Sequence, residues 1–297
     1  VLGLNEGDPV EMEYWTYASG SLTNKGFKEL QKELLAIYEN LAKRLIEVAE
    51  GKTIVIPLSG GYDSRLVLAL LIKQGYKNIH CFTYGVKTSF EMKIAKKVAA
   101  KLNVKLEVVE YDNAFIDRHF DKNEFFEYIK FASNFVSLSH IQDFLAVRYL
   151  HNEKIIPIDS IIAPGHSGDI FSGTHISNNI DVNSPHQLAR SEIKKKHYSL
   201  NLGSSANINY YDESCFPYSN MEAWSWKERQ AKFIVNSLRI YDYFDYKSVL
   251  PLWDKELADF FRIVSLKFKN REFLGQYEIN NNLYDSVSFR VFNDLGV

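Results

Sequence analysis

The sequence predicts an α/β protein in which an open parallel sheet is flanked by helices and followed by a mostly helical C-terminal half. Between residues 27 and 111, short β-branched runs alternate with segments of helical period, which is the pattern of repeated β-α-β units. After residue 174 the strand-like runs give way to helical segments rich in aromatic side chains. Because the crossovers of β-α-β units are right-handed, the helices are expected to pack back onto the sheet.

Each element of the first half follows from its own residue pattern. Residues 27–49 repeat leucine, isoleucine and valine at three- and four-residue steps, which predicts an amphipathic helix closed by Gly51. Strands are expected at 53–59, 78–85 and 104–111, with one helix ending at Gly75 and another at 90–102 between them. Proline has no ladder donor, so Pro57 is placed near the end of its strand, where pairing is already finished.

The second half is expected to contain one further strand among helices. Helices are predicted roughly at 122–134 and 139–151, a strand at 158–164, a glycine-rich turn at 165–173, and helices at 186–198 and 222–246. A long loop is predicted at 201–220, and the aromatic side chains are attributed to core packing. Residues 1–26 are expected to form a linker-like segment, and residues 27–297 a single domain.

Composition and charge limit the classes of partner. The 35 basic and 37 acidic side chains give a formal charge of −2, so neither a nucleic acid nor an anionic membrane is expected, and a small-molecule substrate is. Cys81 and Cys215 have neither the number nor the spacing of a disulfide framework or zinc site, which predicts a reducing, cytoplasmic setting. No apolar run approaches the roughly 20 residues that span a bilayer. The polar start at Val1 lacks a signal-peptide pattern and indicates a processed or excised part of a longer protein.

The stretch Ser59-Gly60-Gly61-Tyr62-Asp63-Ser64 links a predicted strand directly to a predicted helix. Such a turn points several backbone N–H groups and the positive end of a helix at one spot, which makes an anion cradle. Glycines allow a phosphate to approach the backbone, and the serines add hydroxyl donors. A carboxylate at 63 would repel a polyphosphate unless a divalent cation lies between them, so Mg²⁺ is implied.

These six residues resemble the pyrophosphate loop of the N-type ATP pyrophosphatases. Three further segments are similar to the synthetase domain of the asparagine synthetase family, which includes β-lactam synthetase. They are "CFTYG" followed by "SFEMKIAKKVAAKLNV", "PGHSGDIFSG", and "VLPLWDKELADFF" followed by "SLKFKNREFL". The "EYW" at residues 13–15 is similar to the family's tail just before this domain, so the resemblance covers nearly the whole chain.

The resemblance implies an adenine nucleotide α-hydrolase-like, Rossmann-like fold over residues 27–297 and a two-step ligation that uses ATP and Mg²⁺. A substrate carboxylate attacks the α-phosphorus of ATP, pyrophosphate leaves, and ammonia or an amine then displaces AMP. The implied pyrophosphate ligands are Ser59, Gly60, Gly61 and Ser64, and the implied magnesium ligands are Asp63 and Asp169. Adenine and ribose would lie near Leu58, Phe82, Thr83 and Gly165. Glu91 falls on the family's acidic position, and the catalytic cation would be Lys267, with Lys269 in reserve and Arg271 nearby.

Some residues depart from the family's pattern. His166 stands where asparagine synthetase has glutamate, and Asp169-Ile170 where it has Asp-Glu, so the acceptor specificity is open and His166 is a candidate to contact substrate. Arg65 is more readily explained by a surface ion pair than by a substrate carboxylate. The family's glutamine-hydrolysing domain has no counterpart in this sequence. Ammonia therefore comes from a glutaminase domain or subunit missing from this chain, or an amine comes from solution.

Two alternatives stay open. One is another branch of the same nucleotide-binding superfamily, such as an NAD or GMP synthetase or a tRNA-modifying enzyme. The near-neutral charge and the lack of a paired-cysteine motif weigh against the tRNA branch. The other is a degenerate nucleotide-binding module that regulates or scaffolds a partner.

Overall fold

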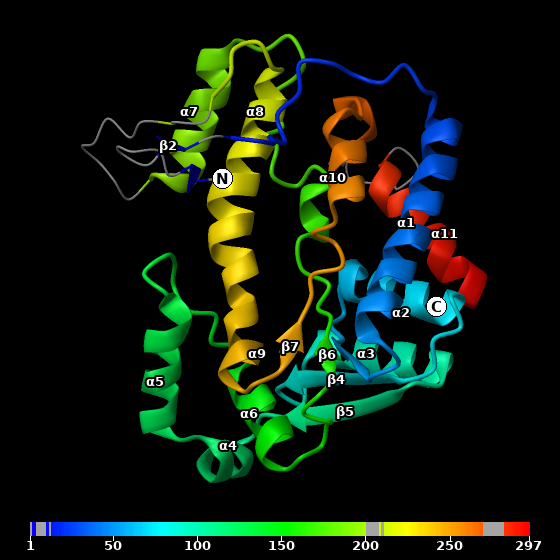
Figure 1. Ribbon diagram of the computed structural model, residues 1–297, viewed down its shortest axis with the longest axis vertical. Coiled ribbons are helices and arrows are strands. Elements are labelled where there is room, and N and C mark those ends of the chain that lie inside the picture. Colours follow the sequence, from blue (N-terminus) through cyan, green and yellow to red (C-terminus); the bar gives the residue numbers. More distant parts are fainter. Residues whose placement is uncertain (1, 4–9, 12, 200–207, 209–210, 270–281) are drawn as a thin grey trace.

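The core of the protein is a five-stranded parallel sheet with the strand order β5-β4-β3-β6-β7 (Figure 1). Its strands are β3 (Ile54–Pro57), β4 (Ile79–Gly85), β5 (Lys105–Glu110), β6 (Ile161–Ile162) and β7 (Lys247–Ser248). The computed structural model describes residues 2–3, 10–11, 13–199, 208, 211–269 and 282–297. The predicted open parallel α/β sheet is confirmed, and Pro57 is the last residue of its strand, paired in register with Phe82.

Both faces of the sheet are covered, which explains the nearly continuous apolar runs of its strands. Ile54 and Ile56 point into a core formed with α1 (Phe27–Ala49), α2 (Tyr62–Lys73), α3 (Phe90–Leu102), α10 (Lys255–Arg262) and α11 (Leu283–Leu295). Val55, which lies between them in β3, points to the opposite core with α5 (Lys122–Ser133), α6 (Phe144–Asn152) and α9 (Arg239–Tyr243).

A long helical rod, residues 217–243, connects the outlying helix α7 (His186–His197) to the sheet (Figure 1). The rod consists of α8 (Pro217–Trp224), a π-helical part (Ser225–Ile234), a 3₁₀ turn (Val235–Leu238) and α9. π-helical segments are rare and often occur at functional sites. Arg229 and Gln230 of this part donate hydrogen bonds to Asp169.

Several predicted boundaries were wrong. The helix predicted from 139 begins only at Phe144, and the helix predicted from 222 begins at Pro217, so residues 217–220 are not part of a loop. The short helix α4 (Asn113–His119) was not predicted. The sheet also continues beyond residue 174 with β7, whose two residues are too few to show an alternating pattern. Most of the loop predicted at 201–220 lies outside the described residues.

Part of the segment predicted to be linker-like packs on the core. Tyr17 is buried and stacks on Trp226, with 5.1 Å between ring centroids, and Trp226 stacks on Trp253 at 3.8 Å. Two two-residue strands, β1 (Leu2–Gly3) and β2 (Val10–Glu11), pair antiparallel before it. The division into residues 1–26 and 27–297 stays a prediction.

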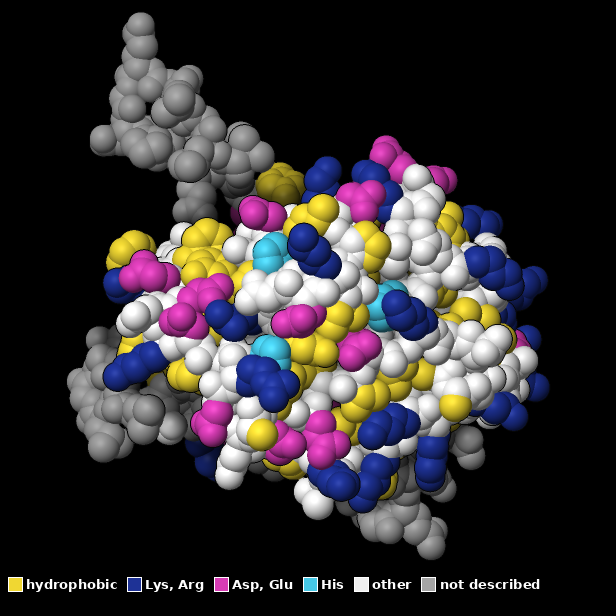
Figure 2. All heavy atoms as spheres, turned by 90° about the horizontal axis from the view of Figure 1, so that it is seen from below, with side chains coloured by type: hydrophobic (Ala, Val, Ile, Leu, Met, Phe, Trp, Pro, Cys, Tyr) yellow, Lys and Arg dark blue, Asp and Glu magenta, His cyan; other side chains and the backbone are white. Residues whose placement is uncertain are grey.

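The surface carries both signs of charge. On the face shown in Figure 2, basic and acidic side chains are interspersed among apolar ones, in keeping with the formal charge of −2. Among the described helices, none combines the length and apolar character needed to cross a bilayer.

Candidate active site

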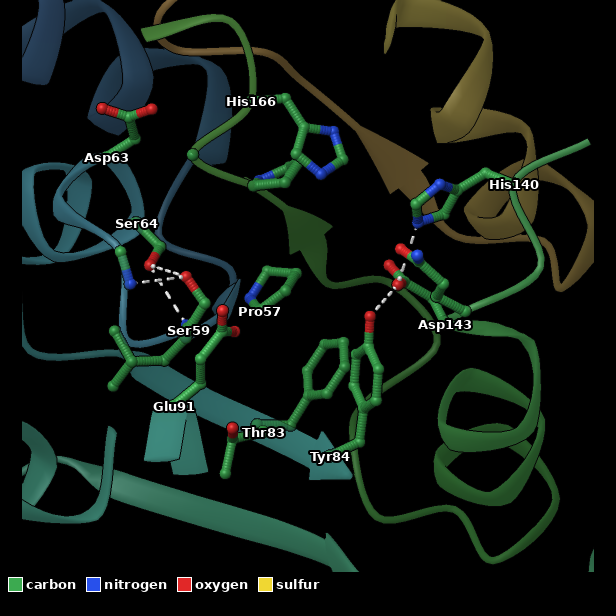
Figure 3. Close-up of a pocket in the computed structure, with 16 residues that line it drawn as sticks. Pro57, Ser59, Asp63, Ser64, Thr83, Tyr84, Glu91, His140, Asp143 and His166 are labelled. Carbon is green, nitrogen blue, oxygen red and sulfur yellow. Dashed lines mark hydrogen bonds and ion pairs between the residues drawn. The ribbon is translucent and has the colours of Figure 1, made fainter. Parts of the chain in front are cut away.

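The glycine loop lies at the carboxyl end of β3, where open α/β sheets bind their ligands. The hydroxyl of Ser64 accepts a hydrogen bond from the Ser59 amide at 3.1 Å and lies 3.2 Å from the Ser59 hydroxyl (Figure 3). The Ser59 hydroxyl in turn accepts from the Gly61 amide at 3.1 Å. Helix α2 starts directly after Gly61, which provides no side-chain cap. The two serines therefore close the loop, and the helix N-terminus stays available to an anion.

The second glycine turn packs onto this loop without space for side chains. A Cβ on Gly165 would lie 2.2 Å from the Ser64 amide nitrogen, and a Cβ on Gly168 would lie 2.5 Å from the Asp63 carboxyl group. Distances of this kind require glycine, because no real Cβ contact is so short. The two glycine segments that were predicted from the sequence are thus in direct contact.

A pocket of about 260 Å³ opens above the glycine loop (Figure 3). Ten of the predicted site residues line it: Leu58, Ser59, Gly61, Asp63, Ser64, Phe82, Thr83, Glu91, Gly165 and His166. Six lining residues were not predicted as site residues: Pro57, Tyr84, His140, Gln142, Asp143 and Pro164. No lysine or arginine among the described residues lines the pocket. Gly60 lies in the loop against Glu91, where a Cβ would come within 2.9 Å of the Glu91 Cα.

Asp169 lies in the second turn, but its carboxylate faces the π-helical part of the rod and not the pocket. It contacts His175 Nε2 at 2.9 Å and accepts hydrogen bonds from Gln230 at 3.1 Å and Arg229 at 3.4 Å. Burial raises the pKa of Asp169, but His175 and the charge of Arg229 outweigh burial and hold that pKa below its ordinary value. The carboxylate is therefore ionised and already hydrogen-bonded.

The two aspartates fit Mg²⁺ unequally. Mg²⁺ is usually held by one or two carboxylates together with substrate phosphates and water. Asp63 fits this role because it lines the pocket beside the phosphate cradle, while its Oδ1 accepts a hydrogen bond from the Tyr284 hydroxyl at 2.7 Å. Asp169 as oriented does not, since its oxygens face Arg229 and Gln230. Among the described residues, no three His, Cys, Asp or Glu side chains gather as a metal site, so the paired-aspartate site stays a proposal.

The predicted catalytic lysines lie away from the pocket lining. Lys267 is exposed, and its ammonium lies over the Phe268 ring at 4.8 Å. Lys269 is fully buried, with its Nζ 2.9 Å from each carboxylate oxygen of Glu222. Arg271 lies outside the described residues. The structure thus gives Lys269 the position of a buried structural partner.

Arg65 supports the glycine loop. Its guanidinium donates to the carbonyl oxygens of Gly61 at 3.2 Å and Gly60 at 3.4 Å, and it lies over the ring of Tyr62 at 5.0 Å. The surface ion pair expected for Arg65 does not form among the described residues. An arginine that binds backbone carbonyls in this way stabilises the turn of the loop.

The side of the pocket opposite the glycine loop is built around Asp143, which is 4% exposed. Its carboxylate accepts hydrogen bonds from the hydroxyls of Tyr84 and Tyr241 and contacts His140 Nε2 at 3.2 Å. We call Tyr84, His140 and Asp143 the far wall. Burial lowers the pKa of His140, but the hydrogen bond and charge of Asp143 outweigh burial and raise it.

The far wall was not predicted from the sequence, and its residues differ in whether a sequence signal could have found them. Tyr84 could have been found, because it follows Phe82 and Thr83 at the carboxyl end of β4. His140 and Asp143 could not, since they precede α6 in a segment that was predicted to be helical. Nothing in their spacing points toward a strand end on another element.

Fold and pocket together define an α/β protein with an anion cradle at the carboxyl edge of a parallel sheet. Residues 47–251 match the family model of asparagine synthase, and the chain belongs to this family of ATP-using synthetases. No curated protein sequence matches the chain.

Solved structures of low sequence identity are similar to this chain. An NH3-dependent NAD synthetase from Campylobacter jejuni is 16% identical over 50% of this chain and 61% of its own, less than two thirds of its length, with a TM-score of 0.29. An NMN synthetase from Francisella tularensis is 15% identical over 80% of this chain and 94% of its own, with a TM-score of 0.31. A U34-tRNA thiolase from Methanococcus maripaludis is 14% identical over 89% of this chain and 81% of its own, with a TM-score of 0.29.

Proposed function

We propose that the protein is an ATP-dependent amide-forming ligase that adenylates a substrate carboxylate and transfers the acyl group to ammonia or an amine. The observation that supports this is the arrangement of one pocket, in which the phosphate cradle faces a wall of imidazole and carboxylate groups. The cradle suits the triphosphate of ATP, and the far wall suits the binding of a nitrogen nucleophile that donates hydrogen bonds.

In the first step, a carboxylate oxygen of the substrate bonds to the α-phosphorus while the bond from that phosphorus to pyrophosphate breaks. The amides of Ser59 and Gly61, which now bond to serine hydroxyl oxygens, would donate to the oxygens of the leaving pyrophosphate. Asp63 would hold Mg²⁺ beside the cradle, and Asp169 is the second ligand that the family resemblance implies. The ion would supply positive charge that offsets the charge of the triphosphate. Adenine and ribose would lie near Leu58, Phe82, Thr83 and Gly165, as expected at strand ends.

In the second step, the nitrogen atom bonds to the acyl carbon and AMP leaves with the electrons of the broken C–O bond. Asp63, Glu91 and Asp143 line the pocket, and no described lysine or arginine does. Acidic side chains in a pocket lining favour a hydrogen-bond-donating partner, which suits ammonia or an amine. We propose that this nitrogen comes from a glutaminase domain or subunit outside this chain or from solution, and that the reaction takes place in the cytoplasm.

ATP–pyrophosphate exchange with a panel of amino acids and sugar acids tests this function. Exchange that depends on Mg²⁺ and on one carboxylic acid is expected, and Ser64→Ala is expected to reduce it, because the loop loses its closing hydroxyl. Ser133→Ala, at the end of α5 and outside the pocket, serves as the matched control. Exchange with no acid, despite measurable ATP binding, would contradict the proposal.

A second candidate function is a nucleotide-binding module without catalysis. The observation that favours it is the orientation of Asp169, whose carboxylate is bound by Arg229 and Gln230. If this orientation is permanent, ATP binding would show little dependence on Asp169. Calorimetric titration of wild type and Asp169→Asn with ATP and Mg²⁺ separates the two functions, because the ligase requires a clear loss of affinity in the variant.

A further inference from the structure

His166 has a hydrogen-bond partner outside the pocket that determines its tautomer. Its Nδ1 lies 3.1 Å from the hydroxyl oxygen of Ser237 in the helical rod. That hydroxyl donates its hydrogen to the backbone carbonyl of Ile234 at 2.5 Å. A serine hydroxyl has one hydrogen, so both contacts are satisfied together when Ser237 donates to Ile234 and accepts from His166. The proton of a neutral His166 therefore sits on Nδ1, and Nε2 carries a lone pair.

The other side of the His166 ring faces the pocket. Figure 3 shows the ring pointing into the space between the glycine loop and the far wall, with His140 and Asp143 on its far side. His166 and His140 lie with their ring centroids 6.2 Å apart. The lone pair of Nε2 is thus presented to the cavity in which both substrates of the proposed ligation would meet.

The surroundings of the two histidines favour opposite charge states. Burial and the neighbouring His140 lower the pKa of His166, against the opposing charges of Asp143 and Asp169. The pKa of His140 is raised by Asp143, as described above. The charged or titratable groups that act on His166 are therefore Asp143, His140 and Asp169, while Ser237 contacts it from the rod. Two neighbouring titratable groups whose pKa values are shifted in opposite directions commonly divide the acid and base roles of an enzyme.

We propose that His166 is the general base that accepts a proton from the attacking nitrogen, and that Ser237 is a positioning residue that keeps His166 Nε2 unprotonated. The proposal rests on the proposed ligase function. As the nitrogen bonds to the acyl carbon, one of its protons moves to Nε2, and the C–O bond to AMP breaks with its electrons on the phosphate oxygen. Asp143 stabilises the resulting imidazolium, because its carboxylate is buried beside it.

Nitrogen NMR of the full chain labelled with ¹⁵N-histidine tests the tautomer without any substrate. The chain has eight histidines, so the His166 signals are identified as those lost in His166→Gln. A protonated Nδ1 and an unprotonated Nε2 are expected at neutral pH. Ser237→Ala is expected to lose this preference, and Ser237→Thr, which keeps the hydroxyl, to retain it. A cationic His166 at neutral pH, or a proton on Nε2, would overturn the proposal.

Kinetics of the two half-reactions test the base, with the acid found by pyrophosphate exchange and ammonium chloride as the nitrogen probe. His166→Gln is expected to keep exchange within about twofold and to lower amide formation by about 100-fold or more. Compared at a constant concentration of free ammonia, the wild-type amide rate should fall as the pH drops, because a protonated Nε2 accepts no proton, and this fall should vanish in His166→Gln. Ser237→Ala should lower amide formation and change its pH profile, and Ser237→Thr should restore both.

Controls separate this proposal from the function it rests on. Ser225→Ala removes a buried hydroxyl from the same rod and should change neither half-reaction, provided thermal unfolding shows a folded protein. Equal loss of exchange and amide formation in His166→Gln, or unchanged amide formation, would refute the base role. No exchange with any acid in the wild type would instead refute the ligase function and the catalytic role together, while the spectra would still report the tautomer.

Discussion

Lys269 and Glu222 form a fully buried ion pair, and removing one partner should destabilise the protein strongly. Both side chains are 0% exposed, and the Lys269 ammonium lies 5.7 Å from the ring centres of both Tyr17 and Tyr218. Burial raises the pKa of Glu222 and lowers that of Lys269, while each partner opposes the shift of the other. Each charge therefore depends on its partner for compensation in a site without water access.

Lys269→Met keeps most of the side-chain volume but leaves the Glu222 carboxyl group without its cation. The expected cost is about 3 to 5 kcal/mol in the free energy of unfolding, a large part of the roughly 5 to 15 kcal/mol of an ordinary domain. Glu222→Leu combined with Lys269→Met should recover most of that loss, because an apolar pair of similar volume leaves no buried charge. Urea unfolding followed by tryptophan fluorescence measures all four members of this double-mutant cycle.

The loss should also depend on pH in a defined direction. Without Lys269, burial raises the pKa of Glu222 further above its ordinary value of 4.5. The folded variant then binds a proton on Glu222 that the unfolded chain releases. This proton stabilises the folded variant below the pKa that Glu222 has in the unfolded chain, and the stabilisation is lost as the pH rises through the pKa that Glu222 has in the folded variant. The deficit relative to wild type should be smaller at about pH 5 than at about pH 8.

Two results would refute this reasoning. A single-variant loss below about 1 kcal/mol would show that the carboxyl group finds another partner or water. Wild-type stability of Lys269→Met together with a large loss of turnover would instead return Lys269 to the catalytic role predicted from the sequence.

Three further predictions follow from the site and the thiols. Gly165→Ala should lower stability by about 1 to 3 kcal/mol and weaken ATP binding, because its Cβ would lie 2.2 Å from the Ser64 amide; unchanged thermal unfolding would contradict the close packing. Asp63→Asn should weaken ATP binding with Mg²⁺ but not with EDTA, as measured by calorimetry; equal loss in both would exclude a metal role. Burial raises the pKa of Cys81 to about 12, so a thiol reagent should label only Cys215 until the chain unfolds; two rapidly reacting thiols in the native protein would contradict this.

Local pattern predicted the elements that carry the phosphate cradle. The helices at 27–49 and 90–102 have the predicted bounds, because their apolar faces repeat at the helical period over many residues. Short elements such as β7 and α4 were missed, since a few residues cannot show a period. The helix predicted from 139 was too long, since the observed helix begins at Phe144, directly after its N-cap Asp143.

The sequence by itself determined the glycine loop of residues 59–64 and its place between a strand and a helix. Backbone geometry and side-chain period act over a few residues, so they can be recognised without knowing the fold. Only the tertiary structure decided which groups face that loop. His166 and the far wall come from separate segments, and Asp169 turns toward Arg229 because a π-helical segment places that arginine beside it. The orientation of these side chains depends on packing between segments distant in sequence, which a local sequence pattern cannot predict.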